Sequence, residues 1–495
     1  MLMPGFIDAH THFGNAAAWA SRVGLYDARD AEEALALVGA AARRVPAGFW
    51  ITGGDIGAAL AWDADARGEP RPAPLPIDRR ALDRVTSDHA VLLRRIDGAY
   101  VANSLAIARA RLSGVQPDPR GGRMERDASG GLTGIFHGRA GERLAELVPP
   151  PNLEQRVAGG RIALRDLASV GITSIHDVAR LDAASQRALF HTDVERSGTD
   201  LEIFRELQRR GELSVRVYAF LSLPLWRETV AAGIRPRTDE GRIRFGALKA
   251  FMDGFLMDEP YANDPRWSGD FTFRFVDEKT MAADIAAADA AGFDPVVHCI
   301  GDRAHRLLID WYEAAIRANA ARDRRFRVIH AWYPSAKDVA RIGRLRLLVD
   351  VTPQHLLNDV RSVEKKLGPA RAKTAHAWRS LASAGARLEV VSDWPGSFNE
   401  QRVTPLAPLE NIAYAIDRPW HPEEGLTVEE AMHAYTSTPA YASYEEDRKG
   451  MLRQNMLADV VVLSRDISGA NAKEIKDTRV EATLLGGETI HGALS

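Results

Sequence analysis

Short apolar runs rich in β-branched residues alternate along the chain with longer stretches in which apolar residues recur at helical spacing. This alternation is typical of an α/β protein whose parallel strands are joined by helices. Helical periodicity is clear at 154–169, 279–291 and 303–320. The predicted strands number eight, the count of a (β/α)8 TIM-like barrel: 6–12, 172–178, 215–222, 245–253, 295–300, 327–332, 347–353 and 388–394.

Two regions fall outside this repeat. Residues 13 to about 150 separate the first two strands and contain a strand of their own, 91–98, and a glycine-rich hairpin, 121–136. Because connections of this length usually carry their own substructure, we expect an inserted subdomain over the barrel mouth. Residues 446–495 contain short strands and turn residues, which predict a small β-sheet after a barrel domain spanning 1–445.

The composition excludes several classes of function. The net charge of −3 over 495 residues argues against a nucleic-acid partner, because phosphate binding needs a basic excess. Cys299 is the only cysteine, which excludes an intrachain disulfide and a zinc site made of several cysteines. No apolar run reaches membrane-spanning length and the N-terminus lacks signal-peptide features, so we expect no membrane partner and a cytoplasmic location.

Polar side chains stand at the ends of the predicted strands, where a barrel would otherwise carry valine, isoleucine or leucine. His10 and His12 lie two apart on the first strand, so their imidazoles would point to the same face. Barrel enzymes form their active sites at the C-terminal ends of the strands. Burying so many polar side chains at the C-terminal end of one barrel costs free energy that packing alone does not explain. We therefore interpret them as a functional site. The set is His10, His12, Lys249, His298, His330 and Asp393.

Imidazoles and carboxylates are the ligands of zinc and related divalent ions. Four histidines and one aspartate exceed the needs of one catalytic zinc, which keeps a position open for water, so the set favours two ions over one. Lys249 has three interpretations at this point. It is a base with a lowered pKa, an ion-paired structural lysine, or a carbamate formed with carbon dioxide that serves as a carboxylate-like bridge.

The chemistry that follows is metal-assisted hydrolysis. A bound divalent ion lowers the pKa of its water to about 7, which makes hydroxide available as a nucleophile. Asp393 would act as the general acid and base, because it can accept the proton of that water and pass it to the leaving nitrogen or oxygen.

The segments PGFIDAHTH, ALKAFMDG, VVHCIGDRA, VIHAW and VVSDWP resemble the motifs of the amidohydrolase superfamily. They are most similar to its YtcJ-like branch (amidohydrolase family 3), which includes N-substituted formamide deformylases, and the match runs from residue 4 to about 465. The resemblance implies a distorted barrel beside a small β-sandwich. It also implies a ligand set: His10, His12 and Asp393 for the more buried metal, His298 and His330 for the second, and carboxylated Lys249 as the bridge.

The chain departs from the family pattern in two places. It begins almost at the Pro-Gly-Phe segment, whereas such proteins usually carry several dozen earlier residues that form much of the sandwich. We therefore expect a truncated sandwich whose strands at 458–463 and 480–491 lack partners. Three explanations follow: the start codon is misassigned, the protein is a fragment, or another subunit, as in a homodimer, covers the exposed edge. In the insert, Asp97-Gly98 is followed by Ala99 where relatives tend to carry histidine, and Leu132 stands where they tend to carry proline. Both changes bear on substrate identity.

Five further residues are candidates for contact with the substrate: Tyr100, His176, Trp332, Gln354 and Trp394. Core packing accounts at least as well for the three aromatic residues, and a hydrogen-bonded position in the core accounts better for His176. His355, next to Gln354 at the end of the seventh strand, is a candidate of the same kind.

Together the residues and the resemblance predict a zinc-dependent amidohydrolase that acts on a carbon–nitrogen bond other than a peptide bond. Its small-molecule substrate would be an amide, an N-formyl compound or a cyclic amide. An ester or lactone hydrolase and a deaminase remain alternatives, because related barrels change bond type through their loops. A truncated, inactive barrel is the third alternative. The six polar residues in the barrel core argue against an inactive barrel, because burying them costs free energy that only a function would explain. The missing N-terminal strands of the sandwich argue for it.

Overall fold

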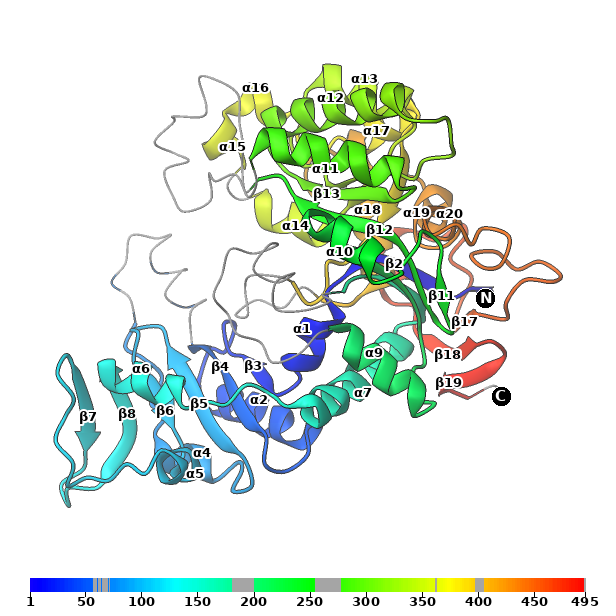
Figure 1. Ribbon diagram of the computed structural model, residues 1–495. Helices are drawn as coiled ribbons and strands as arrows, with labels where there is room; N and C mark the ends of the chain where they lie inside the picture. The colour runs from blue at the N-terminus through cyan, green and yellow to red at the C-terminus, as the bar shows by residue number, and fades with distance from the viewer. Residues whose placement is uncertain are drawn as a thin grey trace. The chain divides into compact units, whose positions relative to one another are not determined.

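The computed structural model describes residues 1–56, 60, 64, 70, 72–179, 200–253, 277–360, 363–396 and 405–493. Its main sheet has eight parallel strands in the order β2–β9–β10–β12–β13–β14–β15–β16 (Figure 1). Thr11 forms a parallel bridge to Trp394, and the Asp393 amide donates to the His10 carbonyl at 3.0 Å. These contacts join the first strand to the segment after the last one. The sheet is therefore a nearly closed TIM-like barrel, as predicted.

All eight predicted strands are confirmed. Every residue of β2 and of β9 is buried, as expected for barrel strands that are covered on both faces and therefore appear as continuous apolar runs. The strands are β2 (Phe6–Thr11), β9 (Ile172–Val178), β10 (Arg216–Ser222), β12 (Ile243–Phe251), β13 (Asp294–Cys299), β14 (Arg327–His330), β15 (Leu348–Val351) and β16 (Arg387–Val390), with the short β11 (Asp239–Glu240) paired to β12.

Helices connect these strands, and three of them occupy the stretches in which helical periodicity is clear. Four neighbouring helices on the outer face of the barrel lie side by side in the order α11, α12, α13 and α17 (Figure 1). The helices of this part are α7 (Leu153–Ser169), α9 (Asp200–Arg209), η1 (Leu223–Leu225), α10 (Trp226–Ala231), α11 (Glu278–Ala290), α12 (Asp302–Ala318), α13 (Ala336–Arg344), α14 (Pro353–Asp359), α15 (Val363–Leu367), α16 (Pro369–Ala372), α17 (Trp378–Ala384), α18 (Pro408–Ile416), η4 (Pro422–Glu424), α19 (Val428–Ala434), α20 (Ser437–Ala442) and α21 (Ala472–Lys476).

Gly14–Ala163 form a second compact unit, together with the segment that begins at Gly396. The unit has a six-stranded sheet in the order β3–β4–β5–β6–β8–β7 and two apolar clusters of its own. The hairpin predicted at 121–136 is the antiparallel pair β7–β8. Its elements are α1 (Phe13–Ala18), β3 (Arg22–Gly24), α2 (Ala31–Arg44), β4 (Trp50–Ile56), α4 (Arg79–Asp83), β5 (Ala90–Arg95), β6 (Tyr100–Ala102), α5 (Ser104–Arg109), β7 (Gly122–Arg126), β8 (Leu132–Gly138) and α6 (Arg139–Glu146).

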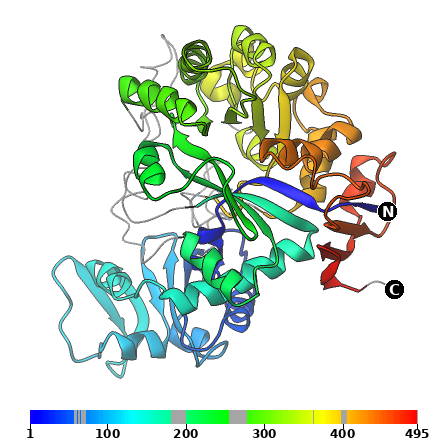
Figure 2. The same cartoon turned by 45° about the vertical axis from the view of Figure 1, so that its right-hand side comes forward.

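A four-stranded sheet holds both ends of the chain, in the order β1 (Leu2–Pro4), β17 (Val460–Leu463), β18 (Val480–Leu485) and β19 (Glu488–Gly492). Both termini lie beside it (Figure 2). The expectation that the C-terminal strands lack partners is wrong. Leu2–Pro4 pairs antiparallel with Val460–Val462, and the Met1 amino group donates to the Leu463 carbonyl at 2.9 Å. The three residues of β1, which lie just before Gly5 and the first barrel strand, supply this partner.

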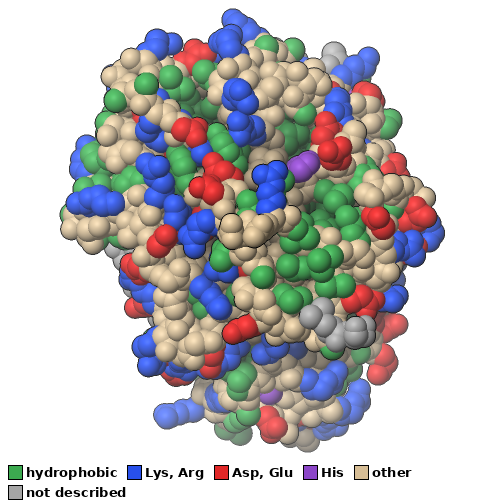
Figure 3. Space-filling view, turned by 90° about the vertical axis from the view of Figure 1, so that its right-hand side faces the viewer, with side chains coloured by type: hydrophobic (Ala, Val, Ile, Leu, Met, Phe, Trp, Pro, Cys, Tyr) green, Lys and Arg blue, Asp and Glu red, His purple; other side chains and the backbone are tan. Residues whose placement is uncertain are grey.

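No helix among the described residues is long and apolar enough to cross a membrane. On the face drawn in Figure 3, Lys and Arg side chains are interspersed with Asp and Glu. This mixture accords with the net charge of −3.

Candidate metal centre

The six predicted ligands lie along one end of the barrel. His10 is the second-last residue of β2, His12 directly follows that strand, and Asp393 comes three residues after β16. Lys249 lies in β12, His298 in β13, and His330 is the last residue of β14. All six therefore stand near the C-terminal ends of their strands, which is where a barrel builds an active site.

Two of these residues have an uncommon backbone conformation. The φ angle is +74° at His330 and +58° at Asp393, in the left-handed region that side-chain-bearing residues rarely adopt. Such a conformation costs about 1–3 kcal/mol and persists where the surrounding structure holds it, often at functional sites. His330 is the last residue of β14 and Asp393 follows β16 by three residues, so both unusual conformations lie just beyond a strand and at a candidate ligand.

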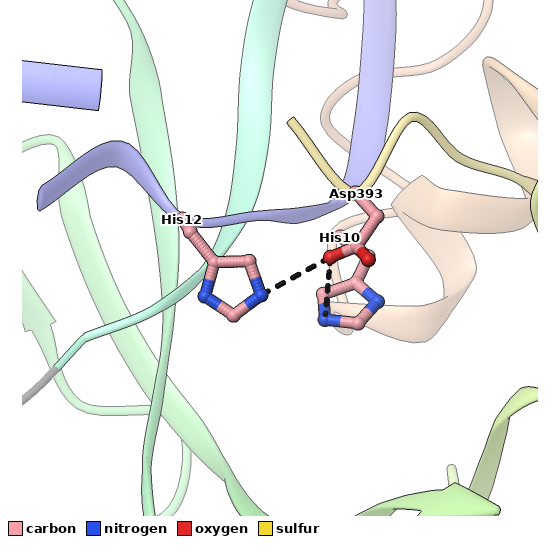
Figure 4. Close-up of side chains that lie close together, drawn as sticks. All are labelled: His10, His12 and Asp393. Carbon is pink, nitrogen blue, oxygen red and sulfur yellow. Dashed lines mark ion pairs between the residues drawn. The ribbon is translucent and has the colours of Figure 1, made fainter. Parts of the chain in front are cut away.

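His10, His12 and Asp393 form a compact buried group (Figure 4). Asp393 Oδ1 lies 3.1 Å from His12 Nε2 and 3.7 Å from His10 Nε2. All three ligand atoms lie within 4.8 Å of one another. In a tetrahedral site with bonds of about 2.0–2.1 Å, neighbouring ligand atoms are about 3.3 Å apart. The spacing and the donor types therefore fit a divalent ion such as zinc.

The pKa values of His10 and Asp393 favour the protonation states that bind a cation. Burial lowers the pKa of His10 well below its ordinary value, and the neighbouring Lys249 lowers it further. Burial would raise the pKa of Asp393, but the hydrogen bond and charge of His12, with His355 and Lys249, bring it below its ordinary value. The histidine is therefore neutral and the aspartate ionised, which is the protonation state that metal binding requires.

Lys249 is fully buried, and its Nζ lies 3.3 Å from His10 Nε2. Its Nζ also lies 4.6 Å from the centre of the Phe251 ring. Burial lowers the pKa of this amine to about 7, against the opposing attraction of Asp393 and Asp350. The neutral amine is therefore far more accessible at neutral pH than in an exposed lysine.

A second group of metal-binding donors consists of His330, His355 and Asp393, again within 4.8 Å of one another. His355 Nε2 lies 3.4 Å from Asp393 Oδ2. His298 is not a member of this group, although its ring centre is 4.7 Å from that of His330. The sequence analysis placed His355, at the end of the seventh predicted strand, only among the candidates for contact with the substrate.

The remaining candidates have diverse surroundings. Trp332 packs edge-on against His355, with ring centres 5.5 Å apart, and the Trp394 backbone takes part in barrel closure. His176 is buried with its Nδ1 3.1 Å from Arg327 Nη2, and Gln354 donates to Asn411 at 3.3 Å. Tyr100 belongs to the Gly14–Ala163 unit and lines a cavity there with Arg22, Trp50 and Arg94. Their role in substrate binding stays a prediction.

Asp8 is a site-supporting residue that the sequence analysis missed. Its Oδ1 accepts the backbone amides of His10 at 3.3 Å and of Ser392 at 3.1 Å. One buried carboxyl thus joins the two segments that carry His10 and Asp393. Burial raises the pKa of Asp8 to about 7.

A buried ionic cluster inside the barrel was also missed. Arg327 is 1% exposed, and its guanidinium lies 3.1 Å from Glu389 and 3.5 Å from Asp350. It also donates to the Ala9 carbonyl at 2.9 Å. Asp350 Oδ2 in turn lies 3.9 Å from His10 Nδ1, which places a carboxylate behind a candidate ligand. Such partners orient metal-binding histidines in other proteins.

Replacing Arg327 by methionine is expected to lower the free energy of unfolding by about 3–5 kcal/mol, because it leaves two buried carboxylates without their cation. The shift in the midpoint of urea-induced unfolding measures this. Arg344→Met is the matched control, since that arginine is 65% exposed in an ion pair with Glu313 and such a pair contributes about 1 kcal/mol or less. Equal, small losses in both variants would refute a structural role for the cluster.

Comparison with known proteins adds to this geometry. The sequence profile of the amidohydrolase family matches residues 1–491. The putative amidohydrolase YtcJ of Bacillus subtilis is 26% identical over 99% of this chain and 89% of its own length. The N-substituted formamide deformylase of Arthrobacter pascens is 26% identical over 98% of this chain and 87% of its own. Among solved structures, an uncharacterised metal-dependent hydrolase from Pyrococcus furiosus superposes with a TM-score of 0.65 at 25% identity, covering 94% of this chain and 88% of that one.

Proposed function

The chain belongs to the amidohydrolase family and is a hydrolase, and from that premise we propose that it cleaves a carbon–nitrogen bond with the help of a divalent metal, zinc in the first instance. The observation that carries this proposal is the buried group of His10, His12 and Asp393, whose three donor atoms have the types and spacing that a divalent ion needs. When bound, such an ion would polarise the scissile carbonyl and lower the pKa of water.

Asp393 is the residue we assign to proton transfer. Its carboxylate is ionised and 8% exposed, and it sits between the donor nitrogens of His12 and His355. It can accept a proton from the attacking water and donate that proton to the leaving nitrogen. A nitrogen leaving group needs this help, because an amide anion is a far poorer leaving group than a neutral amine.

Lys249 is the residue we assign to the carbamate. A neutral amine is required for this step: its lone pair forms a bond to the carbon of carbon dioxide, and one proton leaves the nitrogen for solvent. Burial supplies the neutral amine by lowering the Lys249 pKa to about 7. Among the described residues the Lys249 side chain forms no ion pair with a carboxylate, which argues against an ordinary structural lysine. The product is an anion that could bridge two cations.

The substrate class we propose is an amide, an N-formyl compound or a cyclic amide. The name of the Arthrobacter pascens relative, N-substituted formamide deformylase, supports the N-formyl class. Ester and lactone hydrolysis and deamination use the same donors, so substrate tests must include them.

We expect activity to disappear when metal is removed with a chelator and to return with added zinc, because the proposed chemistry depends on Lewis-acid polarisation. The measurement is a screen of N-substituted formamides, N-acyl amides, cyclic amides and matched esters, with formate or amine release as the readout. Activity that survives complete metal removal would contradict the proposal. Preference for the ester or lactone of a matched pair would replace the substrate class with the second candidate.

A further inference from the structure

The Gly14–Ala163 unit contains a cavity of about 440 Å³ on one face of its six-stranded sheet. Pockets that bind small molecules usually measure about 300–1,000 Å³. A row of three residues crosses the cavity floor: Arg94 of β5 is in register with Gly54 of β4 on one side and with Tyr100 of β6 on the other. Residues in register across neighbouring strands lie on the same face of a sheet, so all three belong to the cavity face.

Two glycines shape this floor. Gly141 of α6 packs so closely on the Tyr100 ring that a side chain at this position would collide with it. Helix α6 therefore covers the Tyr100 side of the sheet face. A Cβ on Gly54 would lie only 2.8 Å from the Arg94 Cβ, so a larger residue there would displace the arginine. Glycine at position 54 thus leaves room over the sheet for the Arg94 side chain.

The charged side chains that line the cavity are both arginines. They are Arg94 and, from β3, Arg22, and no described Asp or Glu residue lines the cavity with them. Among the described residues Arg94 has no side-chain hydrogen bond or ion pair, whereas its neighbour Arg95 pairs with Asp97 at 2.5 Å. A guanidinium offers planar donors that match a carboxylate, so the charge of the lining favours an anion.

The rest of the lining is largely apolar, which favours an organic anion over an inorganic one. Trp50 is 9% exposed and Leu92 is 3% exposed, and both lie on the sheet side of the cavity. Val148 and the three prolines at 149–151 line it from the segment after α6. A hydrated ion such as phosphate would lose water against these surfaces without compensation. An aromatic ring would gain from packing on them.

We propose that this cavity is a small-molecule site separate from the candidate metal centre, and that it binds an aromatic carboxylate. The acid group lies against Arg94 and Arg22, and the ring packs against Trp50 and Val148. The proposal does not rest on the proposed function, because the lining residues all belong to the Gly14–Ala163 unit and the ligand needs no metal ion.

The test is isothermal titration calorimetry of the full-length protein with 2-naphthoate. Acetate, inorganic phosphate and the neutral 2-naphthalenemethanol are the comparison ligands, because each lacks either the ring or the carboxylate. Each titration is made on zinc-loaded and on chelator-treated protein, since a carboxylate can also bind a metal ion. Thermal unfolding confirms that every protein used is folded.

The key variants are Arg94→Met, which keeps the apolar stem and removes the charge, and Arg94→Lys, which keeps the charge without the planar donors. The matched control is Arg80→Met. It removes the same charge from the same unit, and Arg80 is 74% exposed and does not line this cavity.

We expect 2-naphthoate to bind zinc-loaded and chelator-treated protein with the same Kd. Arg94→Met is expected to weaken binding by about 10–100-fold, as for the loss of a hydrogen bond to a charged group. Arg94→Lys should weaken it less, and Arg80→Met should leave it unchanged. The three comparison ligands should bind at least about 10-fold more weakly than 2-naphthoate, because each makes only one of the two kinds of contact.

Four results would overturn the proposal. The first two are the absence of 2-naphthoate binding at millimolar concentration and equal binding by wild type and Arg94→Met. The third is binding that requires zinc, which would place the carboxylate at the metal centre. The fourth is phosphate binding as tight as that of 2-naphthoate, which would leave a general anion site. A failure of the proposed function appears elsewhere, as a lack of hydrolysis in the substrate screen.

Discussion

Asp393→Asn is expected to lower kcat/KM by about 10³–10⁴-fold, the upper range for removing a general acid–base group. Asparagine has nearly the same shape, so the barrel closure through the neighbouring backbone is kept. It cannot accept the proton of water as a carboxylate can, and it offers a weaker ligand at the point where His12 approaches to 3.1 Å. Steady-state kinetics at saturating zinc, on the best substrate from the screen, measures the effect.

The matched control is Asp310→Asn, because Asp310 is 51% exposed and pairs with Arg341 on the surface of α12. That variant should keep wild-type kinetics. Metal content is measured on both proteins, so that loss of the ion and loss of proton transfer are separated. Retention of more than about a tenth of the wild-type kcat/KM by metal-loaded Asp393→Asn would remove Asp393 from the mechanism, given the 10²-fold minimum expected of such a group.

The barrel was largely predictable because its strands are buried on both faces and therefore appear as unbroken apolar runs between helical stretches. The predicted bounds differ from the observed ones mainly at the C-terminal ends. The run predicted at 327–332, for example, ends as a strand at His330. The reason is local: His330 and Ala331 both take positive φ angles, so the backbone leaves the sheet where the apolar sequence continues.

The convergence of His10, His12 and Asp393 was predictable for a similar reason. A period of two puts the first pair on one face of a strand, and the C-terminal ends of all barrel strands meet at one end. His355 could be suggested only as a substrate contact. Its direction depends on how the chain turns from β15 into α14 at Thr352 and Pro353, and residue spacing does not specify that turn.

The buried cluster of Arg327, Asp350 and Glu389 had a visible signal that was not used. Each of these charged residues interrupts an apolar run, one in each of three consecutive predicted strands. What the sequence does not contain is the register. The structure aligns Asp350 with Glu389 across the β15–β16 pair and brings Arg327 from β14 to both carboxylates. Only that alignment brings the three separate charged residues into one buried ion-paired group.

Lys249→Ala is expected to lower kcat by about 10³-fold, the upper range for removing one preorganised electrostatic group, and to reduce the metal content. Lys249 is fully buried with its Nζ 3.3 Å from His10 Nε2, where a carbamate anion would join the donors and an ammonium would oppose a cation. Kinetics and elemental analysis on the purified variant measure the two losses.

Lys449→Ala is the control, because Lys449 is also buried but forms an ion pair with Glu445 at 2.6 Å and donates to Ser174 at 2.8 Å. We expect that variant to lose stability while its folded fraction keeps the wild-type metal content and kcat. The two variants are expected to differ because Lys449 has a carboxylate partner, Glu445, whereas Lys249 lies next to the candidate metal ligand His10.

Rescue separates the three interpretations of Lys249. If its role is that of a bridging carbamate, millimolar acetate or formate should restore part of the activity and the metal content of Lys249→Ala, since a small carboxylate can occupy the vacated space and supply the missing anion. If Lys249 is a base, a small amine should restore activity and the carboxylates should not. If it is only structural, neither additive should act, and the loss should appear as unfolding, as in Lys449→Ala. Rescue by amine alone would therefore refute the carbamate and leave Asp393 with a second proton carrier beside it.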